Sequence, residues 1–255
     1  MSEVVIDGLK IQYVDVGEGS PVLLLHGWLA NKESMAPIYN QLSRDFRCIA
    51  LDFPGMGGSE EQKTPWCCDD YADFVEAFMQ KLDIKNPIGI GHSNGGRVLL
   101  KMASRKEGLF SKLLLIDAAG IRPKHSAKWY VKVYTAKAAK AVLGLPLINK
   151  TGLLEKLQNR VGSADYRNSS EILKKTMSRL IEEDLTEQIS AIRVPTLLVW
   201  GEKDTATPLS DAYVMEKKIS NAGVAVIPGA GHFSYLEGAA QFAAIMDVYF
   251  KEDKK

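Results

Sequence analysis

The chain has 255 residues, of which 46% are hydrophobic and 25% are charged, the usual make-up of a soluble globular protein. This length suits one α/β domain that carries an insertion. The formal net charge is only +1, so the chain has no overall attraction for nucleic acid or an anionic membrane, and neither is an expected partner. No apolar run approaches the roughly 18 residues of a membrane span, and the N-terminus shows no signal-peptide pattern.

The cysteines predict a reducing environment. The chain has three of them, Cys48, Cys67 and Cys68, and the neighbouring pair cannot easily form a disulfide bond with each other. No His or Cys stands at the spacing of a zinc site, so we predict neither a metal nor another cofactor. We expect a cytoplasmic protein.

Strand and helix patterns alternate along the chain. Asp7-Gly8 predicts a hairpin turn, and the apolar run 22–25 predicts a strand buried on both faces. The other expected strands are 4–6, 9–16, 46–51, 87–90, 112–116, 196–200 and 224–227, and the expected helices are 34–43, 69–82, 97–103, 209–218 and 239–250. The helix 97–103 has the alternation of a half-buried helix. This order predicts an α/β fold with a mostly parallel, doubly wound sheet and helices on both faces.

One long segment contains no convincing strand. Between residues 121 and 186 the pattern is helical and is interrupted by Gly and Pro. We therefore predict a core of residues 1–120 and 187–255, with a helical cap of residues 121–186 inserted after the sixth strand. Loops at the carboxyl edge of a parallel sheet build functional sites, so we expect the cap to cover such a site.

A Gly-rich stretch joins the strand 87–90 to the helix 97–103. Its sequence, Gly91-His92-Ser93-Asn94-Gly95, has the Gly-x-Ser-x-Gly pattern of a nucleophile elbow, a tight strand–turn–helix connection that exposes the serine hydroxyl. The two glycines leave room for the strand and the helix to approach each other. Ser93 is therefore the predicted nucleophile.

A serine hydroxyl needs a base that removes its proton, and the chain has four histidines. His232 lies in a Gly-rich loop after the last strand, at the sheet edge where Ser93 is expected, so it is the predicted base. His26 and His92 are predicted to be structural. His125, in the cap segment, is predicted to lie on the surface.

The base in turn needs an acid that fixes its tautomer. Asp204 follows the strand 196–200 and reaches the same sheet edge as the base. Asp117 is the rival candidate, because it ends the strand beside the elbow, and its alternative role is a helix or loop cap at the root of the inserted segment. The backbone N–H groups of Trp28 and Asn94 are the predicted oxyanion donors, since both lie next to the expected position of the nucleophile.

From end to end the chain resembles an α/β-hydrolase with a helical cap after the sixth strand. The segments that carry the resemblance are His26-Gly27-Trp28, Asp52 to Ser59, Gly91 to Gly95, Gly201 to Asp204, and Gly231-His232. The resemblance implies the α/β-hydrolase fold and a catalytic triad in the chain order Ser, Asp, His, with Asp204 as the acid. Relatives with an Asp nucleophile are excluded by Ser93.

The predicted residues indicate a reaction class. We predict a serine hydrolase that cleaves carboxylic esters of small to medium acyl groups through an acyl-enzyme, with a thioesterase or lactonase that uses the same residues as the alternative. Relatives that cleave carbon–carbon bonds usually carry a Trp after the catalytic histidine, where this chain has Phe233. A small-molecule receptor on the same fold is the alternative outside the enzymes.

The predicted cap is basic. Residues 121–186 carry thirteen Lys or Arg and six Asp or Glu, a net charge of +7 on a chain whose total is +1. Such an excess is typical of a solvated surface, or of a segment that attracts an anionic or carrier-linked ester substrate. Trp129 and Tyr130 are candidate pocket residues on this segment, and Phe233 is a third candidate beside the predicted base.

Overall fold

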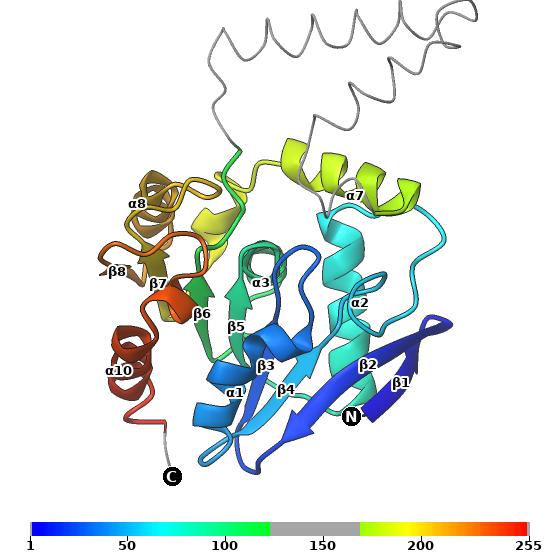
Figure 1. Ribbon diagram of the computed structural model, residues 1–255, viewed down its shortest axis with the longest axis horizontal. Coiled ribbons are helices and arrows are strands. Elements are labelled where there is room, and N and C mark those ends of the chain that lie inside the picture. The colour runs from blue at the N-terminus through cyan, green and yellow to red at the C-terminus, as the bar shows by residue number, and fades with distance from the viewer. Residues whose placement is uncertain (1, 123–168, 254–255) are drawn as a thin grey trace, which may run out of the picture. The chain divides into compact units, whose positions relative to one another are not determined.

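The computed structural model describes residues 2–122 and 169–253. The eight strands in these ranges form one sheet in the order β1-β2-β4-β3-β5-β6-β7-β8 (Figure 1). The strands are β1 (Ser2–Ile6), β2 (Leu9–Val16), β3 (Pro21–Leu25), β4 (Arg47–Leu51), β5 (Ile88–His92), β6 (Lys112–Ile116), β7 (Thr196–Gly201) and β8 (Ala222–Ile227). β2 runs antiparallel to β1 and β4, and the pairs from β4 to β8 are parallel, so the sheet is mostly parallel as predicted.

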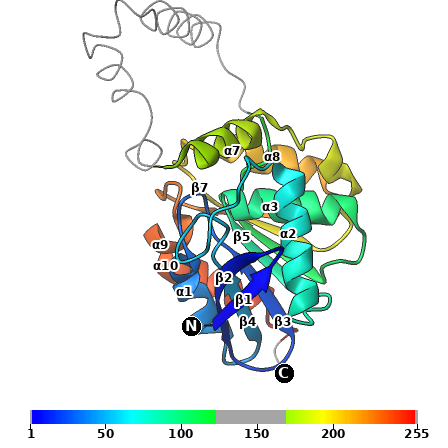
Figure 2. The same cartoon turned by 90° about the vertical axis from the view of Figure 1, so that its right-hand side faces the viewer.

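Helices cover both faces of this sheet. The helices of the described ranges are η1 (Lys32–Met35), α1 (Ala36–Leu42), α2 (Cys68–Lys81), α3 (Asn94–Arg105), α7 (Glu171–Glu182), η3 (Gln188–Ala191), α8 (Leu209–Lys218), α9 (Ser234–Glu237) and α10 (Ala239–Tyr249). Helices α1 and α10 lie on one face, and α2, α3 and α8 lie on the other (Figure 1, Figure 2). None of these helices has the length and apolar character needed to cross a bilayer.

The central strands are buried on both faces, which explains the continuous apolar run in β3. Leu23 and Leu24 are consecutive, so their side chains point to opposite faces, yet both are 0% exposed. On one face, Leu24 belongs to a core cluster that includes Ile38 of α1 and Phe242 of α10. The sheet is thus the middle layer of a three-layer core.

The predicted helix 34–43 begins differently from the prediction. The chain first forms the 3₁₀ turn η1, in which the Asn31 side chain accepts a hydrogen bond from the Ser34 N–H (3.1 Å). The α-helix α1 then starts with Pro37 in its first turn, where a missing N–H costs nothing. Helix α9 was not predicted, because four residues are too few to show a helical period.

Helix α3 is buried along most of its length, so the prediction of a half-buried helix was wrong. Residues 94–103 are all buried, including Arg97 and Lys101. Arg97 donates to the carbonyl oxygen of Glu183 (3.2 Å), and Lys101 forms ion pairs with Glu183 (2.9 Å) and Asp69 (3.0 Å). Arg97 and Lys101 suggested an exposed face. Instead, the hydrocarbon parts of their side chains are buried, and their charged ends reach polar partners.

The predicted cap of residues 121–186 lies mostly outside the described residues. Within the described part, residues Glu171–Glu182 are helical. By proximity of Cα atoms the chain divides into two units, Met1–Arg122 with Lys175–Lys255, and Pro123–Lys174. The boundaries of core and cap stay predictions.

Gly91 near the end of β5 and Gly95 at the start of α3 lie too close to neighbouring backbone to carry a side chain. A Cβ on Gly95 would lie 2.0 Å from the carbonyl oxygen of Leu25. We expect Gly95→Ala to lower the free energy of unfolding by at least about 2 kcal/mol, because this overlap outweighs a gain in helix propensity of about 1 kcal/mol. Denaturant unfolding measures the change. Gly223→Ala, where a Cβ meets nothing within 4 Å, is the control, and equal stability of both variants would contradict the close approach.

Candidate active site

Ser93 lies at the sharp turn between β5 and α3. Its φ of +50° and ψ of −111° form a backbone conformation that residues other than glycine rarely adopt. Its N–H donates to the carbonyl oxygen of Ile116 in β6 (3.0 Å), and its own carbonyl oxygen accepts from the N–H of Ala119 (3.0 Å). These bonds hold the strained turn in place at the N-terminus of α3.

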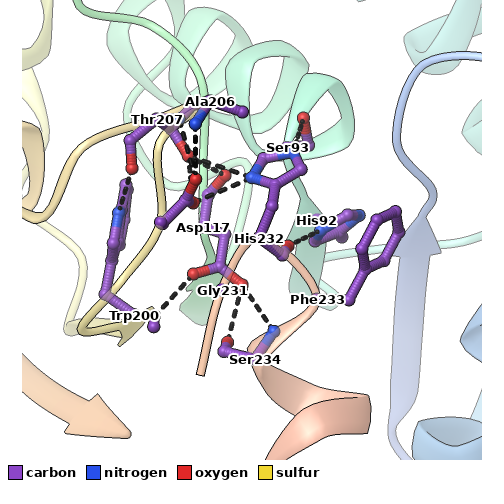
Figure 3. A network of polar contacts seen from close by, with 12 residues as sticks. His92, Ser93, Asp117, Trp200, Ala206, Thr207, Gly231, His232, Phe233 and Ser234 are labelled. Carbon is purple, nitrogen blue, oxygen red and sulfur yellow. Dashed lines mark hydrogen bonds and ion pairs between the residues drawn. The ribbon is translucent and has the colours of Figure 1, made fainter. Parts of the chain in front are cut away.

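His232 and Asp204 reach Ser93 from two other loops. His232, in the loop after β8, places its Nε2 3.0 Å from Ser93 Oγ (Figure 3). Its Nδ1 lies 2.8 Å from Oδ2 of Asp204, in the loop after β7. The structure thus brings together the three residues predicted as nucleophile, base and acid.

Asp204 is surrounded by hydrogen-bond donors. Its Oδ1 accepts from the N–H groups of Ala206 (2.8 Å) and Thr207 (3.0 Å), and its Oδ2 lies 2.7 Å from the Thr207 hydroxyl. Burial raises the pKa of Asp204, but hydrogen bonds from His232 and Thr207 outweigh burial and leave this pKa below its usual value. An ionised Asp204 requires a proton on His232 Nδ1, which leaves Nε2 free to accept the proton of Ser93.

The loop after β3 lies directly against the nucleophile. A Cβ on Gly27 would lie 3.4 Å from the Cβ of Ser93 and 2.8 Å from Nδ1 of His92. Trp28 follows Gly27, and Asn94 is the first residue of α3, where a backbone N–H has no acceptor within the helix. The two residues predicted to bind an oxyanion therefore lie on the two segments that adjoin Ser93.

Two histidines near the site are structural, as predicted. Phe53 donates its N–H to Nε2 of His26 (3.0 Å), so Nδ1 carries the proton and donates to the carbonyl oxygen of Gly27 (2.7 Å). His92 donates from Nε2 to the carbonyl oxygen of His232 (2.8 Å). Burial lowers the pKa of His26 and of His92 to about 4, so both rings are neutral at neutral pH.

A buried ion pair beneath the loop after β3 was missed by sequence reasoning. Asp52 is 0% exposed and accepts hydrogen bonds from the N–H (2.6 Å) and the ammonium group (2.9 Å) of Lys32, and from the N–H of Gly58 (2.8 Å). The pair connects η1, which follows β3, to the end of β4. Opposite charges shortly after two strands were the available signal, but the sequence does not show that these strands are neighbours.

Glu237 of α9 holds the backbone on both sides of the predicted base, and this role was also missed. One carboxylate oxygen accepts from the N–H of Gly231 (2.8 Å), and the other accepts from the N–H of Phe233 (3.2 Å). The spacing of four to six residues was a signal for such a contact. It was not recognised, because α9 itself was not predicted.

Asp117 is not the partner of His232 Nδ1, so it is not the acid. Among the described residues its carboxylate does not cap the inserted segment either, most of which lies outside them. Its buried carboxylate instead accepts hydrogen bonds from the N–H of Gly201 (2.8 Å) and from the N–H (3.0 Å) and hydroxyl (2.6 Å) of Ser234. Burial raises the pKa of Asp117 to about 6.

Of the three candidate pocket residues, one lies in the described part of the chain. Phe233 is 45% exposed, and its ring centroid lies 5.1 Å from that of His92 and 5.6 Å from that of His232. An apolar surface is therefore available beside the predicted base. Trp129, Tyr130 and His125 lie outside the described residues, and their roles stay predictions.

Known proteins share this fold along most of the chain. The family model of the alpha/beta hydrolase fold matches residues 20–239. The AB hydrolase superfamily protein YisY of Bacillus subtilis is 29% identical over 239 residues, which cover 88% of each chain. An esterase of Exiguobacterium antarcticum is 25% identical with a TM-score of 0.77, covering 98% of this chain and 99% of that one. The enol-lactonase of Burkholderia xenovorans is 21% identical with a TM-score of 0.77, covering 98% and 100%. Because the family model matches well over half of the sequence, this chain belongs to the α/β-hydrolase family.

Proposed function

We propose that the protein is a serine hydrolase that cleaves carboxylic esters of small to medium acyl groups. The observation that carries this proposal is the series of contacts from Ser93 Oγ to His232 Nε2 (3.0 Å) and from His232 Nδ1 to Asp204 (2.8 Å). Both distances are those of hydrogen bonds. A proton can therefore pass from Ser93 to His232 while Asp204 stabilises the imidazolium.

In the first half-reaction, Ser93 Oγ attacks the carbonyl carbon of the ester while His232 Nε2 takes the hydroxyl proton. The carbonyl oxygen becomes an oxyanion, and the backbone N–H groups of Trp28 and Asn94 donate to it. Each such donor lowers the barrier by about 3 kcal/mol. His232 then gives its proton to the leaving oxygen as the carbon–oxygen bond breaks, and the alcohol departs from the acyl-enzyme.

In the second half-reaction, water takes the place of the alcohol. His232 removes a proton from the water as its oxygen attacks the acyl carbon, and the same two N–H groups stabilise the second oxyanion. Collapse of this intermediate releases the carboxylic acid and returns the proton to Ser93. A thioester or a lactone would follow the same steps, since only the leaving group differs.

Two observations support an ester substrate, either open-chain or cyclic as in a lactone. The similar protein from Exiguobacterium antarcticum is an esterase. Phe233 stands where relatives that cleave carbon–carbon bonds usually have a Trp.

A receptor on this fold would bind an ester without turnover. An initial burst of p-nitrophenol from p-nitrophenyl acetate, followed by steady turnover, therefore distinguishes the enzyme from a receptor.

The cysteines support a cytoplasmic location. Cys48 and Cys68 are free and buried, and burial raises the pKa of each thiol to about 12. Free thiols are the usual state of cysteines in a reducing compartment.

The nucleophile is tested by Ser93→Ala. We expect this change to abolish labelling by a fluorophosphonate and hydrolysis of p-nitrophenyl acetate, because it removes the attacking oxygen. Circular dichroism checks that the fold is kept. Ser104→Ala, in the same helix α3, is the matched control and should label like the wild type. Labelling that survives in Ser93→Ala would exclude Ser93 as the nucleophile.

The acid is tested by Asp204→Asn. This change should lower kcat by about 10⁴-fold, since a neutral amide neither fixes the tautomer of His232 nor stabilises its charged form. Glu202→Gln is the control, because Glu202 lies on the same loop and accepts from the N–H of Gly229 (2.8 Å). Steady-state kinetics at constant pH measures both. Equal losses in the two variants would assign the effect to the stability of the loop.

The excess of Lys and Arg in residues 121–186 supports the proposal that the substrate is anionic or linked to an acidic carrier. If the charge serves this purpose, an ester with a remote carboxylate should have a higher kcat/KM than a neutral ester of equal length. Salt should reduce the difference, because exposed charges are screened over about 8–10 Å. Changing Lys128, Lys132 and Lys137 to Glu should affect the anionic ester alone. Equal kcat/KM values for both esters at low salt would show that the basic residues do not attract the substrate and only form a solvated surface.

A further inference from the structure

The buried carboxylate of Asp117 is bonded to residues that border both loops that carry the partners of the nucleophile. Its Oδ1 accepts from the N–H of Gly201 (2.8 Å), the last residue of β7, which leads into the loop of Asp204. Its Oδ2 accepts from the N–H (3.0 Å) and the hydroxyl (2.6 Å) of Ser234, which follows closely after His232. Figure 3 shows the carboxylate between these two loops. The Asp117 side chain is thus one of the bridges between the two segments, beside the contact of Glu202 with the N–H of Gly229 (2.8 Å).

The backbone around Asp117 is bonded to the nucleophile as well. The carbonyl oxygen of Ile116 accepts a hydrogen bond from the N–H of Ser93, and the N–H of Ala119 donates one to the carbonyl oxygen of Ser93, both at 3.0 Å. The carbonyl oxygen of Asp117 lies 3.0 Å from the hydroxyl of Thr207, and this hydroxyl lies 2.7 Å from Asp204 Oδ2. The segment therefore meets all three parts of the site at the end of β6.

The donors around Asp117 need an ionised carboxylate. Both of its oxygens accept hydrogen bonds, and an ionised carboxylate has no hydrogen that would point at a donor. A protonated carboxyl or an amide carries hydrogen on one side. The hydroxyl of Ser234 can turn and accept such a hydrogen, but a backbone N–H on that side would lose its acceptor. The side chain is 0% exposed, so bulk water cannot supply a replacement.

We propose that Asp117 is a positioning residue that holds the loops of Asp204 and His232 in place against each other. It acts through the backbone of these loops and does not touch the substrate. Because proton transfer from Ser93 requires both loops to be in place, loss of this carboxylate should slow the chemical step without weakening the binding of a small ester. This inference rests on the proposed hydrolase function.

The same contacts make the positioning effect dependent on pH. Burial raises the pKa of Asp117 to about 6, hydrogen bonds from Ser234 and Gly201 lower it, and the charge of Asp204 raises it. Asp204 and Tyr235 are titratable groups that interact electrostatically with this carboxylate. Above about pH 6 the carboxylate is ionised and holds both loops, and below that pH it is protonated and releases one of them.

The test compares Asp117→Asn with the wild-type enzyme on p-nitrophenyl acetate between about pH 5 and pH 8. At the upper end, kcat should fall by about tenfold to 100-fold with KM nearly unchanged, the loss expected when reacting groups are displaced by up to an ångström. The ratio of wild-type to variant kcat should approach one as the pH falls through about 6.

Asp211→Asn is the matched control. Burial, together with the charge of Asp204, raises the pKa of Asp211 to about 6, and a hydrogen bond with Ser210 in the same helix lowers it. Like Asp117→Asn, this variant replaces one carboxylate by an amide, and its kcat should stay within about twofold of the wild type at every pH.

Ser234→Ala removes one of the three donors to Asp117 and should cause a smaller loss of kcat than Asp117→Asn. In the double variant the two losses should combine to less than their product, because the residues share one contact.

The outcomes separate the inference from the proposed function. If the wild type is active, an unchanged kcat in Asp117→Asn, or a loss that is the same at every pH, overturns the inference alone. A wild-type protein that neither reacts with a fluorophosphonate nor hydrolyses any ester overturns the proposed function and the inference with it. If Asp117→Asn does not fold, Ser234→Ala decides, and an unchanged kcat at about pH 8 overturns the inference.

Discussion

The close approach of β3, β5 and α3 is the constraint on which the site depends. A Cβ on Gly91 would lie 2.6 Å from the backbone of Gly95, and a Cβ on Gly95 would overlap the backbone of Leu25. Because these segments are in contact, the chain must turn within one residue, and Ser93 takes the strained conformation with φ of +50°. The turn aims α3 and its free N–H groups at the edge of the sheet, where the other loops meet.

A layer of buried polar groups lies under the reacting residues. Asp52 is neutralised by Lys32, Asp117 is bonded to three donors, and His26 is kept neutral by burial. Each of these groups connects the ends of different strands. A buried polar group without partners is costly, so each loop is held where its partners require it. This layer gives loops the precision that catalysis needs, although loops are usually the least ordered part of a fold.

Membership of the family does not settle the reaction, because α/β-hydrolases with similar sheets act on different substrates. The similar proteins include an esterase and an enol-lactonase. The chemistry proposed for this chain comes instead from the distances between Ser93, His232 and Asp204. The proposed choice of acyl group rests on Phe233 beside the base and on the basic segment 121–186. The proposal thus assigns reaction and substrate to different parts of the chain.

The sequence by itself determined the alternation of strands and longer helices along the chain, the elbow, and the three residues that the structure brings together. These features depend on local signals, such as the spacing of Gly91 and Gly95 around Ser93, the apolar run of β3, and loops that must end at one edge of a parallel sheet. Only the tertiary structure decided the partners of Asp117, the pairing of Asp52 with Lys32, and the burial of α3 with its charged side chains. Such contacts join residues far apart in the chain, and their energies depend on which strands become neighbours and how much water is excluded, which no local pattern records.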